Sequence, residues 1–200
     1  MSRRLVRLGI LALIVLAAAT GLVLLRPAPR QAETGLGGPF VLETGEAKPF
    51  NASQLAGKPY IIFFGYTHCP DVCPATLTEL ASDIKILGKD ADKMNYVFVT
   101  IDPARDTPAV MQAYVRSFDP RIIGLTGTAA QIATIAREWH VFYRKQPGSG
   151  KDYTMEHSAT AYLMDARGSF AGFFNFQDKP AAQMAKIRAV LAGHSALDGG

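Results

Sequence analysis

Most of this chain lacks an excess of charge of either sign. The formal net charge is +4, but the first 30 residues hold five arginines and no acidic residue, and the rest carries 16 basic and 17 acidic side chains. A domain so close to neutral has no basic stripe to neutralise phosphates, which excludes nucleic-acid binding. Internal repeats and low-complexity tracts are also absent, and hydrophobic residues make up 48% of the sequence. We therefore expect one packed domain.

One apolar segment precedes that domain. Residues 8–25, LGILALIVLAAATGLVLL, form an uncharged run of 18 residues, and a helix of this length would be roughly 27 Å long, close to the hydrocarbon thickness of a membrane. Arg3, Arg4 and Arg7 lie before it, and positive charge on that side predicts a cytoplasmic N-terminus. The sequence therefore predicts a single transmembrane anchor, with the domain on the periplasmic side of a bacterial-type inner membrane.

A cleaved signal peptide is the alternative to this anchor. The apolar run is longer than the usual core of a signal peptide, and no small-x-small cleavage site follows it, which favours an uncleaved helix. The predicted organisation is listed here in chain order: a cytoplasmic N-terminus (1–7), the transmembrane anchor (8–25), a Pro- and Gly-rich linker (26–38), a folded domain (39–193) and a flexible tail (194–200).

Strand and helix patterns alternate within the folded domain. The expected elements are strand 59–66, helix 74–87, strand 95–101, a helix opening at Thr107 and Pro108, strand 121–125, helix 129–139, a hairpin of strands 159–165 and 169–175, and helix 180–191. This order predicts an α/β, thioredoxin-like fold: a mostly parallel central sheet flanked by helices, with a C-terminal antiparallel hairpin. The segment QPGSGKD (146–152) is expected to be a loop.

Both cysteines of the chain, Cys69 and Cys73, follow the first of these strands, at the sheet edge where α/β proteins place their sites. Cys73 precedes Pro74 at the start of a predicted helix, where unpaired N–H groups and the helix dipole favour a thiolate. A thiolate is both a metal ligand and a reactive group, so a metal site and a redox pair both remain open. A structural disulfide would close too short a loop to constrain the unfolded chain much, and disulfide oxidoreductases of this fold place two residues between their cysteines instead of three.

A third metal ligand must come from histidine. His68 directly precedes the first cysteine, and successive side chains in an extended chain point apart. His140 is expected to be a packed or partly exposed imidazole within EWHVFY, and His194 lies in the Gly-rich tail. His157 remains, on the loop entering the hairpin, where Met155 would share its face. Two thiolates and one imidazole fall one ligand short of a structural zinc site, but they suit three-coordinate Cu(I).

Five blocks of the sequence, in order, resemble the Sco/SenC family: GGPF, FFGYTHCPDVCP, TIDPARDTP, GLTGT and HSATAYLMD, within residues 37–174. That family consists of membrane-anchored copper proteins of thioredoxin fold that help assemble the dinuclear copper (CuA) centre of cytochrome c oxidase. The resemblance implies that Cys69, Cys73 and His157 bind one copper ion, as Cu(I) and also as Cu(II). Glu156 stands where the family frequently has Asp.

The resemblance also draws attention to Asp102, Arg105 and Asp106 in the block DPARDT. One interpretation is an Arg–carboxylate cluster that fixes the loop after a strand. The other is a supporting role beside the metal or a docking role, for which Asp102 is the best candidate because it follows a parallel strand on the edge that carries the cysteines. The thioether of Met155 belongs to the same class of supporting candidates.

The leading functional hypothesis is a copper metallochaperone. It would bind one copper ion and pass it by ligand exchange to the copper-accepting subunit of cytochrome c oxidase, without bond-making catalysis, and so would not be an enzyme. The alternative is a thiol-disulfide reductase, in which a redox-active Cys69–Cys73 disulfide keeps the acceptor's cysteines reduced for copper loading. Another periplasmic copper chaperone or a thiol reductant would then be a further partner. A peroxidase of this fold is a third reading, which YTHCPDVCP resembles only loosely.

Overall fold

The computed structural model describes residues 35–148, 152–175 and 177–197, and these belong to one structural unit, residues 32–200. The predicted cytoplasmic N-terminus, the transmembrane anchor and most of the linker lie outside the described residues, as does the end of the predicted tail, residues 198–200. No helix within the described ranges has the length and apolarity needed to cross a membrane.

The elements follow the predicted alternation of strands and helices, with additional short strands before and after it. In chain order they are β1 (Val41–Thr44), β2 (Pro49–Asn51), η1 (Ala52–Leu55), β3 (Tyr60–Gly65), α2 (Val72–Leu87), η2 (Gly88–Lys93), β4 (Asn95–Thr100), α3 (Pro108–Arg116), β5 (Ile122–Thr126), α4 (Ala129–Glu138), β6 (Tyr143–Pro147), β7 (Tyr153–His157), β8 (Thr160–Met164), β9 (Phe170–Asn175) and α5 (Pro180–Leu191). The two η elements are 3₁₀ helices.

The central sheet has seven strands in the order β2-β1-β5-β4-β3-β8-β9. Strands β3, β4 and β5 are parallel, and the other pairings are antiparallel. The sheet is therefore mixed, and the prediction of a mostly parallel sheet is wrong. Short connections join β1 to β2 and β8 to β9 and permit only antiparallel pairing, and β1 and β8 also run opposite to their other neighbours, β5 and β3. The predicted C-terminal hairpin, β8–β9, is confirmed.

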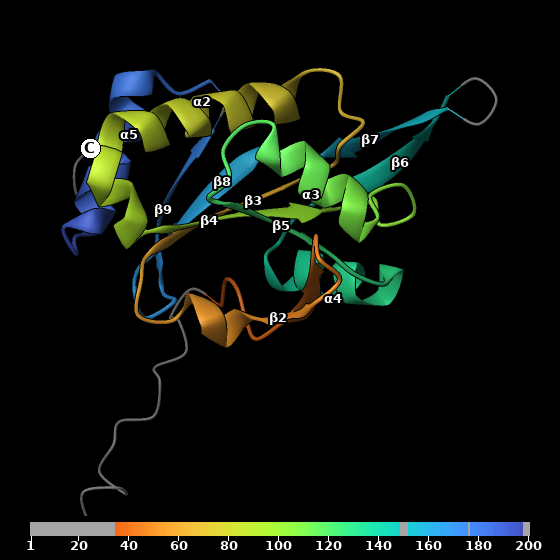
Figure 1. Ribbon diagram of the computed structural model, residues 1–200, viewed down its shortest axis with the longest axis horizontal. Coiled ribbons are helices and arrows are strands. Elements are labelled where there is room, and N and C mark those ends of the chain that lie inside the picture. The colour runs from red at the N-terminus through yellow and green to blue at the C-terminus, as the bar shows by residue number, and fades with distance from the viewer. Residues whose placement is uncertain (1–34, 149–151, 176, 198–200) are drawn as a thin grey trace, which may run out of the picture. The chain divides into compact units, whose positions relative to one another are not determined.

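Helices cover both faces of this sheet. Figure 1 shows α2, α3 and α5 on one face and α4 on the other. Neighbouring residues of β3 point to opposite faces: the Phe63 ring lies 5.7 Å from Phe98, whose ring contacts Tyr114 of α3, whereas the Phe64 ring lies 5.8 Å from Trp139 at the end of α4. All six residues of β3 are buried, as a strand covered on both faces requires.

A second, separate sheet contains the strands β6 and β7, which pair antiparallel, and Tyr143 lies opposite His157. The sequence predicts a loop over 146–152, which is wrong for Gln146 and Pro147 because they belong to β6, whereas residues 149–151 lie outside the described residues. The sequence also places His157 on a loop, which is wrong because His157 is the last residue of β7. The reason is that β6, with the sequence YRKQP, is largely solvent-facing, and such a strand lacks the apolar, β-branched run by which buried strands are recognised.

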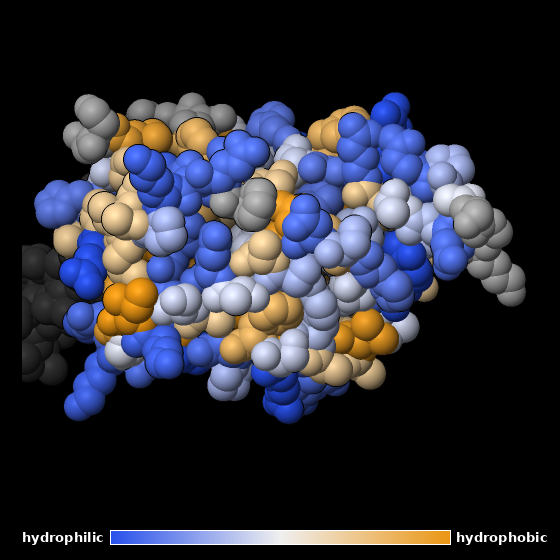
Figure 2. Space-filling view, turned by 90° about the horizontal axis from the view of Figure 1, so that it is seen from above, coloured by the Kyte–Doolittle hydropathy of each residue, from blue (hydrophilic) through white to orange (hydrophobic). Residues whose placement is uncertain are grey.

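The C-terminal segment after α5 returns to the sheet. The Ala196 N–H donates to the Ala171 carbonyl at 2.7 Å, and a Cβ on Gly172 would lie 2.8 Å from the Ala196 Cβ, so the absent side chain at Gly172 permits the close approach. Ser195 and Ala196, which the sequence assigns to a flexible tail, therefore contact β9. On the surface, hydrophilic and hydrophobic residues are interspersed over the face seen in Figure 2.

Candidate metal centre

Three segments of the chain bring a possible ligand set together at the carboxyl end of β3. Cys69 lies in the loop between β3 and α2, Cys73 lies in the first turn of α2, and His157 ends β7. One ligand atom of each residue lies within 4.8 Å of the other two. Because bonds from sulfur and nitrogen to a metal ion are about 2.0 to 2.3 Å long, one ion can reach all three atoms.

A hydrogen bond at the start of α2 joins the two cysteines. Asp71, the N-cap residue, makes no side-chain capping bond. Instead the Cys73 N–H donates to the Cys69 Sγ at 3.4 Å, so a sulfur accepts from one of the unpaired N–H groups that open the helix. The positive end of the helix dipole also favours negative charge at this sulfur. The prediction that the helix N-terminus favours a thiolate at Cys73 is therefore wrong: the sulfur that accepts from the helix N–H group is that of Cys69, and the pKa of Cys73 is raised.

Gly65, the last residue of β3, lets Cys73 approach the sheet. A Cβ at this position would lie 2.7 Å from the Cys73 Sγ and 2.8 Å from a ring carbon of Phe98. Cys73 is fully buried (0% exposed), whereas Cys69 is 9% exposed. The site therefore has one sulfur at its base and one nearer its rim.

The His157 imidazole is oriented by the backbone beside it. Its Nδ1 lies 2.9 Å from the Ser158 carbonyl oxygen, and since a carbonyl can only accept, Nδ1 carries the proton. In the neutral ring the lone pair is then on Nε2, which lies 3.5 Å from the Cys73 Sγ. The ring also stands edge-on to Tyr66, with centroids 5.8 Å apart. A histidine with one ring nitrogen hydrogen-bonded to a carbonyl and a lone pair on the other is typical of a metal ligand.

The two sulfurs share one negative charge in the reduced, metal-free site. A hydrogen bond with Cys73 is the largest cause that lowers the pKa of Cys69 to about 3; burial opposes it, and bonds from the N–H groups of Asp71 and Cys73 support it. The pKa of Cys73 is raised by its hydrogen bond to Cys69, by burial and by the Cys69 charge. Both cysteines are free, so a soft metal ion would need to displace only about one further proton to meet two thiolates.

Asp106, a predicted supporting residue, fixes the loop that carries Cys69. Its carboxylate is fully buried and accepts hydrogen bonds from the Thr67 N–H (3.0 Å), the Thr67 hydroxyl (2.6 Å) and the Thr100 hydroxyl (2.6 Å). Asp102 and Arg105 lie on the same loop after β4 and pair with each other at 2.5 Å. None of the three belongs to the ligand group, so in this structure they act on the loops around it.

The other candidates lie outside the ligand group. Met155 is partly buried and packs against the hydrophobic core. His68 has its Nδ1 3.0 Å from the Thr67 hydroxyl, its own chain neighbour, and His140 and His194 are exposed. Among the residues that the structure describes, the cluster of three contains no other His, Cys, Asp or Glu, in agreement with the two-cysteine, one-histidine set that the sequence suggests.

Sequence reasoning does not identify three residues that shape the site: Gly65, Tyr66 and Tyr153. Gly65 ends a buried strand just before the cysteines, and a glycine there is the one signal that a close approach is required. The Tyr66 hydroxyl accepts from the Met155 N–H at 3.2 Å, and the Tyr153 hydroxyl donates to the Asp102 carboxylate at 2.7 Å. These two contacts join segments far apart in the chain, and no local pattern predicts them.

Comparison with known proteins finds relatives among the Sco proteins. A SCO2-like protein of Rickettsia conorii is 37% identical over 155 residues, which cover 76% of this chain and 76% of that protein. The mitochondrial protein SCO2 of Saccharomyces cerevisiae is 42% identical over 138 residues, which cover 68% of this chain and 46% of that protein.

Two similar solved structures contain copper. Bradyrhizobium japonicum ScoI with copper bound has a TM-score of 0.73 and 46% identity, over 78% of this chain and 99% of that one. Yeast Sco1 with copper bound has a TM-score of 0.73 and 35% identity, over 80% of this chain and 90% of that one. The SCO1/SenC family model matches residues 28–192. The chain therefore belongs to the SCO1/SenC family.

Proposed function

We propose that this protein is a membrane-anchored copper metallochaperone. It binds one copper ion through Cys69, Cys73 and His157 and passes it by ligand exchange to the copper-accepting subunit of cytochrome c oxidase, for the CuA centre. Residues 8–25 anchor the chain, residues 26–38 link the anchor to the domain, and the domain lies on the periplasmic side. Another periplasmic copper chaperone or a thiol reductant is the partner that prepares the site.

The observation that carries this proposal is the composition of the ligand cluster. Two sulfur atoms and a free imidazole nitrogen lie within 4.8 Å of one another, and soft thiolates select Cu(I) over harder cations. A structural zinc site usually has four protein ligands, one more than the cluster offers among the residues in view. Copper bound in the similar ScoI and Sco1 structures supports the same choice of metal.

The test is copper binding by the full chain, reduced and purified in detergent. Competition against a Cu(I) chelator should give about one copper per chain, and Cys69→Ser or Cys73→Ser should each abolish tight binding. His194→Ala is the control, because His194 is an exposed histidine outside the cluster. Unchanged binding by both cysteine variants would rule out this ligand set.

A thiol-disulfide reductase is the second candidate, and the low pKa of Cys69 favours it. The Cys69 thiolate would attack an acceptor disulfide and form a mixed disulfide, releasing one acceptor thiol. Cys73 would then lose its proton and attack Cys69, which releases the second thiol. Two electrons pass to the acceptor, and the Cys69–Cys73 disulfide is the oxidised product. A thiol reductant must then restore the dithiol.

His157→Ala separates the two functions, because thiol exchange needs both cysteines but no imidazole. The variant should lose copper affinity strongly while its disulfide exchange with a model substrate stays within a few-fold of wild type. Oxidase assembly in cells then decides between them. Failure of CuA assembly with His157→Ala would identify copper transfer as the essential activity, and normal assembly with a variant that holds no copper would identify reduction.

A further inference from the structure

The histidine of the ligand cluster lies on an element that the central sheet does not hold. Strands β6 and β7 pair only with each other in the described structure, whereas β3, which leads to the cysteines, lies in the middle of the seven-stranded sheet. Main-chain hydrogen bonds of a sheet therefore do not fix His157 relative to Cys69 and Cys73. Two residues, Ser158 and Ala159, connect His157 to β8 of the central sheet, and side-chain contacts between the β6–β7 hairpin and the rest of the domain supply the further restraint.

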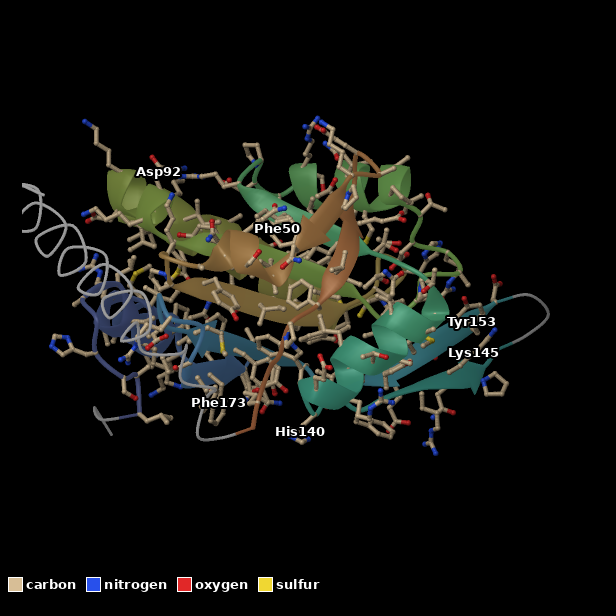
Figure 3. All side chains as sticks on the ribbon, turned by 90° about the horizontal axis from the view of Figure 1, so that it is seen from below. Phe50, Asp92, His140, Lys145, Tyr153 and Phe173 are labelled. Atoms are coloured by element: carbon tan, nitrogen blue, oxygen red, sulfur yellow. The ribbon has the colours of Figure 1, made fainter. Side chains whose placement is uncertain are left out.

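Arg105 makes two of these contacts, both with Tyr153. Its Nη1 donates to the Tyr153 carbonyl at 3.0 Å, and its guanidinium carbon lies 3.6 Å from the centre of the Tyr153 ring. The Tyr153 hydroxyl in turn donates to the Asp102 carboxylate at 2.7 Å. Both the backbone and the side chain of the first residue of β7 are thus held from the loop after β4. Figure 3 shows Tyr153 and Lys145 on the hairpin, and the Lys145 Nζ lies 3.6 Å from the same ring.

Arg105 is itself held in place by hydrogen bonds on the loop after β4. Arg105 Nε donates to the Asp102 carboxylate at 2.5 Å, and the two side chains are only 21% and 5% exposed. The Asp102 N–H donates to the Thr100 hydroxyl at 2.9 Å, at the end of β4. A charge-assisted pair that is this buried and fixed to a central strand is stronger than a solvent-exposed ion pair. Through this pair the β6–β7 hairpin is connected to β4 of the central sheet.

The contacts continue along β7 to the ligand itself. Tyr153, Met155 and His157 lie on one face of the strand, since side chains alternate. The Met155 N–H donates to the Tyr66 hydroxyl, the Tyr66 ring stands edge-on to His157, and the Arg105 guanidinium lies 5.7 Å from the Tyr66 ring. Arg105 therefore contacts Tyr153, at the start of β7, and Tyr66, whose ring lies against the His157 imidazole.

We infer that Arg105 is a positioning residue for copper: by holding Tyr153 it keeps the β6–β7 hairpin where the His157 Nε2 faces the Cys73 sulfur. The inference rests on the proposed ligand set, and it separates the three ligands into two that the fold fixes and one that Arg105 fixes. Without Arg105 the hairpin occupies the binding position for only part of the time, and the apparent affinity falls by that fraction.

The test is a double-mutant cycle on the full chain, with Cu(I) affinity measured by chelator competition. Arg105→Ala should weaken binding about tenfold or more when His157 is present. In the His157→Ala background the same change should alter affinity less than about twofold, because the remaining sulfur ligands do not depend on the hairpin. Arg144→Ala is the matched control: Arg144 lies on the same hairpin and pairs with Glu156 at 2.8 Å, but it is 63% exposed.

A second readout needs no copper. In the metal-free protein, amide hydrogen exchange at residues 153–157 should become faster in Arg105→Ala and stay unchanged in Arg144→Ala. Tyr153→Phe, which removes only the hydroxyl bond to Asp102, should give a smaller effect of the same kind and serves if Arg105→Ala does not fold. Unchanged exchange in β7, or an equal loss of affinity in both His157 backgrounds, would overturn the inference. Wild-type affinity in His157→Ala alone would instead refute the proposed ligand set, and the exchange data would still test the positioning.

Discussion

Gly65 determines how deeply the Cys73 sulfur can lie. Gly65→Ala would place a methyl carbon 2.7 Å from that sulfur and 2.8 Å from the Phe98 ring, and both neighbours are fully buried. Either the first turn of α2 or the Phe98 ring must shift, and overpacking of this kind costs about 1 to 3 kcal/mol. We expect both the free energy of unfolding and the Cu(I) affinity of Gly65→Ala to fall, as measured by denaturation and by chelator competition.

Gly38→Ala is the control for this prediction, because its added methyl would meet only the end of the Glu138 side chain, at 3.2 Å. A Gly65→Ala protein that binds copper as tightly as wild type would show that the depth of Cys73 does not matter for the site.

Cys69 should react as a thiolate at a pH where an ordinary thiol is protonated. A lowered pKa of about 3 means that the thiolate is present above that pH, whereas a free cysteine of pKa near 8.5 loses about tenfold of its thiolate for each unit below it. In the reduced, metal-free protein, alkylation of Cys69 by iodoacetamide should change little between pH 8 and pH 5. Mass mapping of the modified residue measures this, and a tenfold fall per pH unit would contradict it. Cys73, buried with a raised pKa, should stay unmodified.

The three proposed ligands could be named from the sequence because the choice depends on residue type. Cys69 and Cys73 are the chain's only cysteines, and His157 is the histidine left after the others are considered. The groups that tune them could not be predicted in this way. The imidazole tautomer is set by the Ser158 carbonyl, and because every residue has a backbone carbonyl, the residue type gives no signal for it. The Arg105–Tyr153 contact joins the loop after β4 to β7, which lie far apart in the sequence.

At the scale of elements, prediction succeeded where burial imposes a pattern. β3 is buried along its whole length, and α3 and α4 open with side-chain caps at Thr107 and Thr128, so their sequences carry clear signals. It failed for β1 and β2, with four and three residues, and for the solvent-facing hairpin β6–β7. In these strands pairing with a neighbour, not an intrinsic preference, determines the structure.

The packing of α2 on α5 includes one buried carboxylate whose ionisation should destabilise the fold. Asp83 of α2 accepts from the Gln183 Nε2 of α5 at 2.7 Å, and burial is the largest cause that raises its pKa above the ordinary 3.8. Since the folded state then binds a proton more tightly than the unfolded state, stability falls as the pH rises from 3.8 through the raised pKa. The Gln183 Oε1 is buried and has no hydrogen-bond partner among the described residues.

Asp83→Asn should therefore stabilise the protein at pH 7. The amide does not ionise, and its NH₂ group can donate to the Gln183 Oε1, so we expect a gain of about 1 kcal/mol in the free energy of unfolding. The part of the pH dependence that belongs to Asp83 should disappear. Denaturant titrations at pH 4 and pH 7 measure both effects. Asp92→Asn is the control, because it makes the same change at a side chain that is 73% exposed. It should change neither the free energy of unfolding nor its pH dependence, and equal behaviour of the two variants would contradict the prediction.

At the scale of the whole molecule, the excess positive charge lies in the N-terminal segment and not in the domain. The first 30 residues contain arginine and no acid, whereas the remainder is close to neutral, and hydrophilic and hydrophobic residues alternate over the surface in Figure 2. Such a domain has little electrostatic attraction to an anionic membrane surface. Attachment to the membrane should then depend on the apolar run at residues 8–25.

The orientation of that run gives a direct prediction. A reporter that is active only in the periplasm, fused after Gly200, should be active, and a reporter active only in the cytoplasm should be inactive at the same position. Replacing Arg3, Arg4 and Arg7 by uncharged residues should reduce the difference, because positive charge before an apolar run favours a cytoplasmic N-terminus. The reverse pattern in the unmodified chain would show that the domain is cytoplasmic.

The unequal burial of the two sulfurs predicts an order of ligand exchange for the proposed copper transfer. Cys73 is 0% exposed beneath Gly65, and Cys69 is 9% exposed. If the chain passes copper on as proposed, a ligand of the acceptor would reach Cys69 before Cys73, and the bond to Cys73 would be the last to be replaced. The ion would then be shared between two proteins during the exchange and would not have to pass through solution.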